Sequence, residues 1–265
     1  MGRVMGMVDE KATVLANERL TDALWLMTLE APGVARGIGP GQFVHMSLPT
    51  LQAHILRRPF SVYDRDADAG TIDVLYQVVG TGTADMTGWV PGQEASVLGP
   101  IGSRWSPGDG VRRALVVGGG VGAAPLYMLT QELVGQGADV DVILGAATGE
   151  ALVCRQRYSG LCDDRLRCST DDGSLGTAGF ATVPLAELLE EGVAYDYAAV
   201  CGPEPLMRAA SRMTLAAGIR TQVSLERRMA CGIGACLSCT CDTTDGRKRV
   251  CVDGPIFEAD EVEWS

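Results

Sequence analysis

The chain has 265 residues, of which 46% are hydrophobic and 21% charged, as in ordinary globular proteins. This length is large for a single hydrophobic core, so it predicts two domains with a smaller appendage. The formal net charge of −11 argues against nucleic acid or an anionic membrane as a partner.

Several features predict a cytoplasmic protein. No run of about 18 apolar residues is available to span a membrane. The N-terminus has no long apolar core behind a basic start, so it does not read as a secretory signal. The nine cysteines are odd in number and partly at metal-ligand spacing, which favours a reducing compartment.

Residues 11–98 contain short runs rich in β-forming residues. Turns at Pro32-Gly33, Gly39-Pro40-Gly41 and Pro91-Gly92 separate these runs. Many short strands at this spacing predict a small antiparallel β barrel, which we place in a domain of residues 1–108.

Inside this region lies the sequence Arg58-Pro59-Phe60-Ser61. It matches the flavin motif Arg-x-(Tyr/Phe)-Ser, and the region therefore resembles the FAD-binding barrel of ferredoxin-reductase-like proteins. Arg58 can bind a pyrophosphate with two parallel hydrogen bonds, and Ser61 can hydrogen-bond the reactive edge of the flavin ring. Phe60 offers an aromatic face without a tyrosine hydroxyl. A surface arginine beside a buried phenylalanine is the alternative.

A second segment supports the flavin prediction. Leu75-Tyr76-Gln77 leads into a Gly-Thr-Gly-Thr turn that contains Gly82 and Thr83. Gly82 and Thr83 would bring backbone amides and a hydroxyl to the FAD phosphates. The resemblance implies that backbone groups of Leu75 to Gln77 contact the flavin. His45 and His54 lack any acid or nucleophile pattern around them, so we interpret both as structural or solvent-facing.

From Arg113 the pattern changes to that of a nucleotide-binding domain, which we place at residues 109–224. A buried strand, a glycine-rich turn and a helix follow one another, and the turn carries Gly120 and Gly122. Glycines allow a phosphate to approach closely, and the N-terminus of the helix supplies amide donors. Alternating strands and helices continue downstream, which predicts a doubly wound parallel sheet.

Two further places in this domain bear on the cofactor. Cys201-Gly202-Pro203 ends a strand and opens a helix, where ligands of such sheets bind. The resemblance places this turn beside the nicotinamide, and an ordinary buried thiol is the alternative for Cys201. The loop 169–173 is acidic where a reductase specific for NADP would need arginine, so it favours NAD.

The last part, residues 225–265, contains Cys231, Cys236, Cys239 and Cys251. The spacing C-x4-C-x2-C with a later fourth cysteine is the plant-type [2Fe–2S] pattern. Zinc is an alternative, although zinc cysteines usually come as two C-x2-C pairs, and structural thiols are another. We exclude Cys241, because its side chain should point elsewhere.

The order of flavin barrel, nucleotide domain and cysteine loop resembles the electron-transfer subunit of two-subunit, NAD-dependent dihydroorotate dehydrogenase. The resemblance implies FAD, one [2Fe–2S] cluster and NAD in this chain. It also implies a separate catalytic subunit with FMN that oxidises dihydroorotate in pyrimidine biosynthesis, within a heterotetramer. Electrons would pass from that FMN through the cluster and the FAD to NAD+, because FAD can exchange electrons both singly and in pairs.

Nothing in the sequence resembles an acid–base catalyst for a pyrimidine ring, so we assign no catalytic residue to this chain. The cluster should lie at the partner interface. Apolar residues around it form part of that contact or pack locally, and these are Met229, Ile233, Leu237, Ile256 and Phe257.

Two other functions use the same features. One is a related NAD(P)H:ferredoxin-type reductase subunit of a transhydrogenase or hydrogenase complex. The other is a binding module with a structural zinc.

Overall fold

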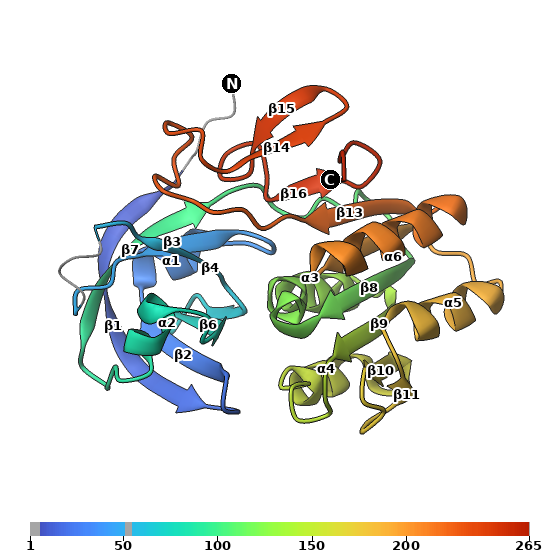
Figure 1. The fold of residues 1–265 in the computed structure, drawn as a ribbon, viewed down its shortest axis with the longest axis horizontal. Coiled ribbons are helices and arrows are strands. Elements are labelled where there is room, and N and C mark those ends of the chain that lie inside the picture. Colours follow the sequence, from blue (N-terminus) through green and yellow to red (C-terminus); the bar gives the residue numbers. More distant parts are fainter. Residues whose placement is uncertain (1–5, 51–54, 265) are drawn as a thin grey trace. The chain divides into compact units, whose positions relative to one another are not determined.

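The computed structural model describes residues 6–50 and 55–264, and Figure 1 shows its elements. The chain divides into two compact units. The first comprises Met1–Arg104, Glu226–Cys241 and Lys248–Pro255, and the second comprises Trp105–Leu225, Asp242–Arg247 and Ile256–Ser265.

The first unit contains a curved antiparallel sheet, which confirms the predicted fold class of this half as a half-barrel. In the described residues it has seven strands in the order β4-β3-β7-β1-β2-β6-β5. Their bounds are β1 Val8–Arg19, β2 Leu24–Glu30, β3 Phe43–Met46, β4 Arg58–Ser61, β5 Asp64–Asp66, β6 Thr71–Gln77 and β7 Glu94–Ile101. The short helices α1 (Pro32–Gly37) and α2 (Thr81–Met86) complete the unit.

The second unit contains a mostly parallel sheet with helices on both faces, as predicted. Its strand order is β11-β10-β9-β8-β12-β13-β16 in the part of the chain that the structure describes. The bounds are β8 Arg113–Gly119, β9 Asp139–Ala146, β10 Leu166–Thr170, β11 Thr177–Ala178, β12 Tyr197–Cys201, β13 Arg220–Ser224 and β16 Ile256–Glu258. The helices are α3 Ala124–Gly135, α4 Arg155–Cys162, α5 Thr182–Glu190 and α6 Glu204–Ala216.

The central strand β8 marks the place where the order of this sheet reverses. Strands β9, β10 and β11 follow it on one side, and β12 and β13 lie on the other. Helices α3 and α4 contact each other on one face, whereas α5 and α6 contact each other on the opposite face (Figure 1). Sheets of this kind bind ligands at the carboxyl end of the strands where the order reverses, which here lies between β8 and β12.

Strand β16 was not predicted. It pairs antiparallel with β13, and Ile256 and Phe257 are each 6% exposed in it. These two residues therefore belong to the core of the second unit, whereas the sequence suggested a partner contact or packing around the cluster. The strands β14 (Thr240–Thr243) and β15 (Gly246–Arg249) form a separate two-stranded sheet.

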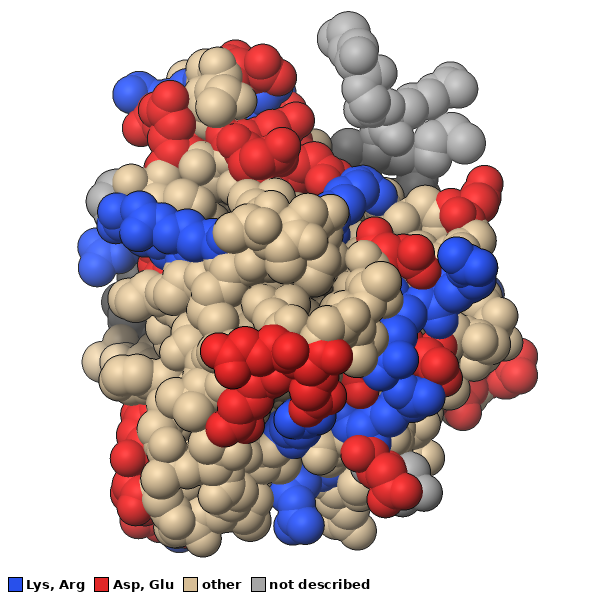
Figure 2. Space-filling view, turned by 90° about the vertical axis from the view of Figure 1, so that its right-hand side faces the viewer, with Lys and Arg blue, Asp and Glu red and all other residues tan. Residues whose placement is uncertain are grey.

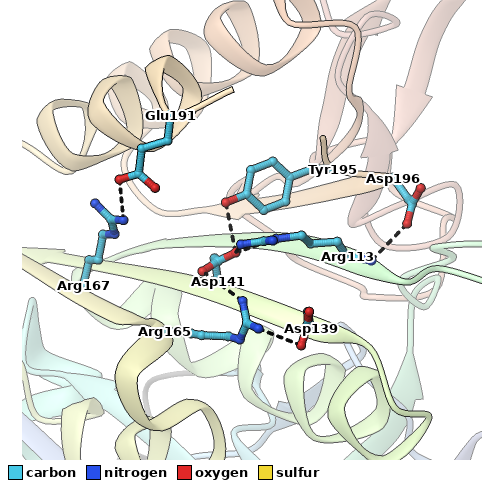
Figure 3. A network of polar contacts seen from close by, with 8 residues as sticks. All are labelled: Arg113, Asp139, Asp141, Arg165, Arg167, Glu191, Tyr195 and Asp196. Carbon is cyan, nitrogen blue, oxygen red and sulfur yellow. Dashed lines mark hydrogen bonds and ion pairs between the residues drawn. The ribbon is translucent and has the colours of Figure 1, made fainter. Parts of the chain in front are cut away.

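The amino ends of β8 and β9 carry a group of charged side chains around the buried Asp141 (Figure 3). Asp141 is 5% exposed and accepts hydrogen bonds from Arg113 Nε at 3.1 Å, Arg113 Nη2 at 3.0 Å and the Tyr195 hydroxyl at 3.0 Å. Arg165 lies 3.8 Å from the second oxygen of Asp141 and 2.9 Å from Asp139. We call these five residues the charge network.

The surface carries charges of both signs. On the face in Figure 2, Lys and Arg side chains adjoin Asp and Glu side chains. Among the helices that the structure describes, none combines the length and the hydropathy that a membrane crossing requires.

Candidate functional site

The predicted cluster cysteines lie on one loop and its neighbouring turn, all within the first unit. We call residues 231–239 the cysteine loop. The Cys231 and Cys236 side chains interact with each other, and so do those of Cys239 and Cys251. Cys239 and Cys251 are 3% and 1% exposed, whereas Cys236 is exposed. Cys241 is buried in β14.

Backbone amides of the loop point at the sulfur atoms. The amides of Ile233 and Cys236 donate to Cys231 Sγ at 3.5 and 3.4 Å, and the amide of Cys251 donates to Cys239 Sγ at 3.4 Å. This curl requires a left-handed backbone at Gly232, with φ of 70°, and at Gly234, with φ of 80°. Such inward-facing amides form an anion-binding concavity.

The pKa values of Cys231 and Cys251 reflect this environment. Burial raises the pKa of Cys231, but the amide donors and the Cys236 thiol outweigh it and lower the pKa to about 7. Burial and the hydrogen bond with the Cys239 thiol raise the pKa of Cys251 to about 12. A bound metal removes the thiol proton outright, so Cys231 and Cys251 would each release a proton when iron binds.

Arg249 places a positive charge beside these sulfurs. Its Nη1 donates to the Gly234 carbonyl at 3.3 Å, and its Nε donates to Asp253 at 3.0 Å. The hydrogen bond with Asp253 raises the pKa of Arg249, and the charges of Cys251 and Cys239 add to that rise. The guanidinium thus remains charged next to the thiolates.

The donor set fits a [2Fe–2S] cluster. Each iron of such a cluster takes two cysteine thiolates, and the four thiols lie as two pairs. Within residues 6–50 and 55–264, no three or more His, Cys, Asp or Glu are grouped so that they could hold a metal ion, so the thiols lie in twos and not as a single-ion site. The pairing in twos, the amide donors and the nearby cation suit a cluster that is negative overall.

The two segments predicted to hold FAD phosphates come together in the first unit. A Cβ added to Gly82 would lie 3.6 Å from Arg58 Nε and 2.8 Å from Leu48 Cδ1, so Arg58 lies beside the α2 turn. Arg58 Nη1 donates to the Leu56 carbonyl at 2.6 Å, which orients the guanidinium. The juxtaposition of an arginine and a glycine turn suits a pyrophosphate.

The aromatic side chains of the two predicted flavin segments, Phe60 and Tyr76, are buried. Phe60 is 9% exposed and Tyr76 is 2% exposed, and their rings meet edge to face with centroids 6.3 Å apart. Burial raises the pKa of Tyr76 to about 12, although the hydrogen bond to Asn17 lowers it. Leu75 is also buried, Pro59 and Ser61 are half-buried, and Gln77 is exposed. The aromatic face of Phe60 therefore packs in the core.

The hydroxyl of Thr83 is engaged in its own turn. It accepts hydrogen bonds from the amides of Val79 at 2.9 Å and Gly80 at 3.3 Å, and it donates to the Gly80 carbonyl at 3.2 Å. The hydroxyl therefore shapes the α2 turn, and its predicted contact with a phosphate stays a prediction.

The nucleotide turn and the Cys201-Gly202 turn meet backbone to backbone. A Cβ on Gly122 would lie 2.6 Å from the Gly202 N and Cα atoms. A Cβ on Gly119 would lie 2.5 Å from Leu206 Cδ2. Only glycine fits at such contacts. The two turns follow β8 and β12, between which the order of the sheet reverses. Gly120 (φ 55°) faces open space, and Cys201 is 8% exposed with its thiol 3.8 Å from the Ser224 carbonyl.

The acidic loop follows β10 at the same edge of the sheet. Asp172 accepts hydrogen bonds from the Ser174 amide at 3.0 Å and its hydroxyl at 2.6 Å, and these lower the pKa of Asp172. The Asp171 amide donates to the Ala146 carbonyl at 3.0 Å, which fixes the loop beside β9. A charged carboxylate at this edge would repel a 2′-phosphate.

The sequence analysis did not identify the position of one polar side chain, that of His45. The ring of His45 is fully buried, and a Cβ on Gly232 would lie 2.6 Å from His45 Nδ1. His45 is therefore not solvent-facing, and His54 lies outside the described residues. Of the apolar residues predicted near the cluster, Ile233 and Leu237 are 51% and 61% exposed.

Known structures define the class of protein. The chain is similar to an NADH-dependent reduced ferredoxin-NADP oxidoreductase, with a TM-score of 0.84, 28% identity, and coverage of 95% of this chain and 89% of that one. It is also similar to the ferredoxin reductase in carbazole 1,9a-dioxygenase, with a TM-score of 0.68, 26% identity, and coverage of 82% and 68%. The fold is thus that of the ferredoxin-reductase-like oxidoreductases.

Sequence relatives define the family. Residues 226–263 match the family model of the iron–sulfur cluster binding domain of dihydroorotate dehydrogenase B. The dihydroorotate dehydrogenase B (NAD+) electron transfer subunit of Geobacillus thermodenitrificans is 36% identical over 260 residues, which cover 96% of this chain and 98% of the relative. That of Desulforamulus reducens is 37% identical over 263 residues, covering 96% and 97%. The chain belongs to the family of dihydroorotate dehydrogenase B electron transfer subunits.

Proposed function

We propose that this chain is the electron-transfer subunit of an NAD-dependent dihydroorotate dehydrogenase in the cytoplasm. It works with a catalytic subunit that contains FMN, in a heterotetramer, during pyrimidine biosynthesis. The observation that carries the proposal is that the two thiol pairs and the flavin motif lie in one compact unit. This arrangement supports a one-electron site and a flavin site within one unit of the chain.

Each cofactor has its own set of residues in this proposal. The cluster ligands are Cys231, Cys236, Cys239 and Cys251. The FAD site comprises Arg58, Pro59, Phe60, Ser61, Leu75, Tyr76, Gln77, Gly82 and Thr83. The NAD site comprises Gly120, Gly122, Cys201 and Gly202. Residues 1–108 hold the flavin, 109–224 the NAD, and 225–265 the cluster.

The cofactors supply one-electron transfer at the cluster, hydride transfer to NAD+, and a flavin that links the two. The protein binds and orients them, and no side chain is assigned to proton transfer. Arg58 orients a pyrophosphate, and the amides of the cysteine loop offset the negative charge of the sulfur atoms. The exposed side chains of Ile233 and Leu237 suit a contact with the catalytic subunit.

The test starts from the visible spectrum of the purified chain. Flavin bands with a reddish shoulder from the cluster, and two irons per chain, are expected. The chain combined with its FMN-containing partner should then reduce NAD+ when dihydroorotate is supplied. A colourless protein that contains zinc would overturn the proposal.

A second function is favoured by one specific observation. The structural similarity of this chain to an NADH-dependent reduced ferredoxin-NADP oxidoreductase suits a reductase subunit of a transhydrogenase or hydrogenase complex. The two functions differ in their partner. Co-purification with a subunit that contains FMN and forms orotate supports the first function, and co-purification with a hydrogenase subunit supports the second.

A further inference from the structure

A buried histidine with no polar partner lies in the first unit. His45 on β3 is fully buried, and neither ring nitrogen has a hydrogen-bond partner among the residues that the structure describes. Burial, together with the charges of Arg57 and Arg58, lowers the pKa of His45 to about 4. The ring is therefore neutral, with one nitrogen that donates and one that accepts.

The ring connects the two predicted redox sites. On the backbone side, His45 is the partner of Pro59 in the pairing of β3 with β4, which is the strand of the flavin motif. Arg57 Nη1 donates to the His45 carbonyl at 3.2 Å, which holds this strand in place. On the side-chain side, Nδ1 faces Gly232, the residue that follows Cys231.

The contact with Gly232 is as close as packing permits. A Cβ at that position would lie 2.6 Å from Nδ1, 3.1 Å from Cε1 and 3.2 Å from Cγ of His45. Gly232 also has a left-handed backbone, with φ of 70°. The ring of His45 therefore leaves no room for a side chain at position 232 of the cysteine loop.

A merely structural side chain at this position would not need to be polar. Replacing an unpaired buried polar group by an apolar group of similar shape is neutral or stabilising. Buried polar groups in proteins are nearly always hydrogen-bonded, so an unpaired one calls for an explanation. The thiolate-rich loop that Nδ1 faces supplies acceptors once a cluster is bound.

We propose that His45 is a positioning residue for the iron–sulfur cluster: its ring seats the cysteine loop on the flavin strand, and its Nδ1–H donates to the sulfur atoms of the loaded loop. The inference rests on the proposed function, because it requires the cluster. A donor to sulfur stabilises the reduced cluster, which carries one more negative charge, and therefore raises its reduction potential.

The test compares His45→Leu, His45→Asn and His45→Gln in the full chain purified with FAD and cluster. The amide nitrogen of Asn can take the place of Nδ1, whereas that of Gln reaches the place of Nε2. The measurement is the midpoint potential of the cluster by spectroelectrochemistry, with the electron paramagnetic resonance signal of the reduced cluster, iron content and FAD content.

For His45→Leu we expect the ratio of reduced to oxidised cluster at a fixed solution potential to fall about tenfold, which is about 59 mV for one electron. His45→Asn should recover most of this ratio, and His45→Gln should not. FAD content should stay unchanged in all three. If His45→Leu loses the cluster altogether, His45→Asn decides: retention of iron and potential supports the proposal, and loss of iron overturns it.

Two results overturn the proposal while the proposed function stands. One is a wild-type potential in all three variants, and the other is the same shift in all three, because a general packing defect does not distinguish Asn from Gln. A wild-type chain without a cluster signal would instead overturn the proposed function itself.

A double-mutant cycle tests the contact independently. Gly232→Ala should reduce the iron retained in the wild-type background, because its new Cβ would meet the ring. In the His45→Ala background the same change should cost less iron, since the ring is gone and only the backbone strain remains. An equal loss in both backgrounds would show that the ring does not seat the loop.

Discussion

The cysteine loop and the charge network are both partly buried groups of polar side chains, but only one of them is complete without a ligand. In the charge network, each carboxylate of Asp139 and Asp141 faces a guanidinium, and the hydroxyl of Tyr195 donates to Asp141 (Figure 3). The three thiols of the cysteine loop and that of Cys251, which become negative on ionisation, are grouped with amide donors and with Arg249. The difference teaches that the network supports a fold, whereas the loop is built for an added metal group.

Loss of a single cysteine should break this comparison most severely. Cys251→Ser should abolish stable cluster binding, because Cys239 loses the thiol with which it is paired at the same iron. We expect iron to fall from two per chain to nearly none, measured by iron analysis and by the visible spectrum.

The matched control is Cys241→Ser, which alters a buried cysteine that we do not assign to the cluster. It should keep its iron. If Cys241→Ser loses the cluster while Cys251→Ser retains it, the assignment of the fourth ligand is wrong.

The charge network should respond in stability alone. Asp141→Ala leaves Arg113 and Tyr195 without their shared acceptor in a buried site. We expect a loss of about 2–3 kcal/mol in the free energy of unfolding, below the value for a fully buried pair because the Arg113 side chain is 31% exposed. Chemical denaturation with urea, followed by circular dichroism, measures this loss.

A half-exposed ion pair of the same unit provides the control for that experiment. Arg167 Nη2 lies 2.7 Å from Glu191, with side chains 35% and 48% exposed. Arg167→Gln should cost no more than about 0.5 kcal/mol. Iron content should be unchanged in both variants, and a cluster lost in Asp141→Ala would refute the division of roles between network and loop.

The carboxyl ends of the strands of the same parallel sheet sharpen the comparison, because glycines and not charged side chains shape the turns there. Gly122→Ala would place a Cβ 2.6 Å from the Gly202 backbone, where no flexible side chain can yield. We expect the dissociation constant for NAD+ to rise at least about tenfold, or about 1.4 kcal/mol, with FAD and iron retained.

Gly135→Ala in helix α3 is the matched change, because nothing lies within 4 Å of its added Cβ. It should bind NAD+ as the wild type does. An unchanged dissociation constant in Gly122→Ala would remove this turn from the nucleotide site. Titration of NAD+ followed by flavin fluorescence or calorimetry measures both variants.

The sequence predicts local features of this protein well, and long-range contacts poorly. The spacing of the cysteines and the change from strand runs to a strand–turn–helix pattern are local, so the cluster loop and both kinds of sheet could be predicted. The contact of His45 with Gly232 joins distant parts of the chain, and no local pattern indicates it. Strand β16 is only three residues long, too short for a periodic pattern, and only its pairing with β13 in the structure identifies it.

The engagement of single side chains was also beyond the sequence. The motif predicts that Phe60 and Thr83 lie at a cofactor, but it does not show that the Phe60 ring meets Tyr76 edge to face or that the Thr83 hydroxyl accepts a hydrogen bond from the Val79 amide. A motif therefore identifies the segment that forms a site more securely than it identifies the side chains that point into it.

The smallest expected effect concerns the positive charge of Arg249, which is paired with a carboxylate as the arginines of the charge network are. Arg249 is held by Asp253 and lies near the sulfurs of Cys239 and Cys251. Arg249→Gln removes a positive charge that favours the reduced cluster. Because the guanidinium side chain is 40% exposed, water screens it, and we expect a smaller fall in the potential of the cluster than for His45→Leu.

Salt distinguishes this charge effect from a change of loop shape. The difference in potential between Arg249→Gln and the wild type should shrink as ionic strength rises, because an exposed charge is screened. Arg247→Gln is the control, since Arg247 pairs with Asp242 and its side chain is 69% exposed. A shift that is independent of salt, or equal in Arg247→Gln, would mean that the arginine acts by holding the Gly234 carbonyl and not by its charge.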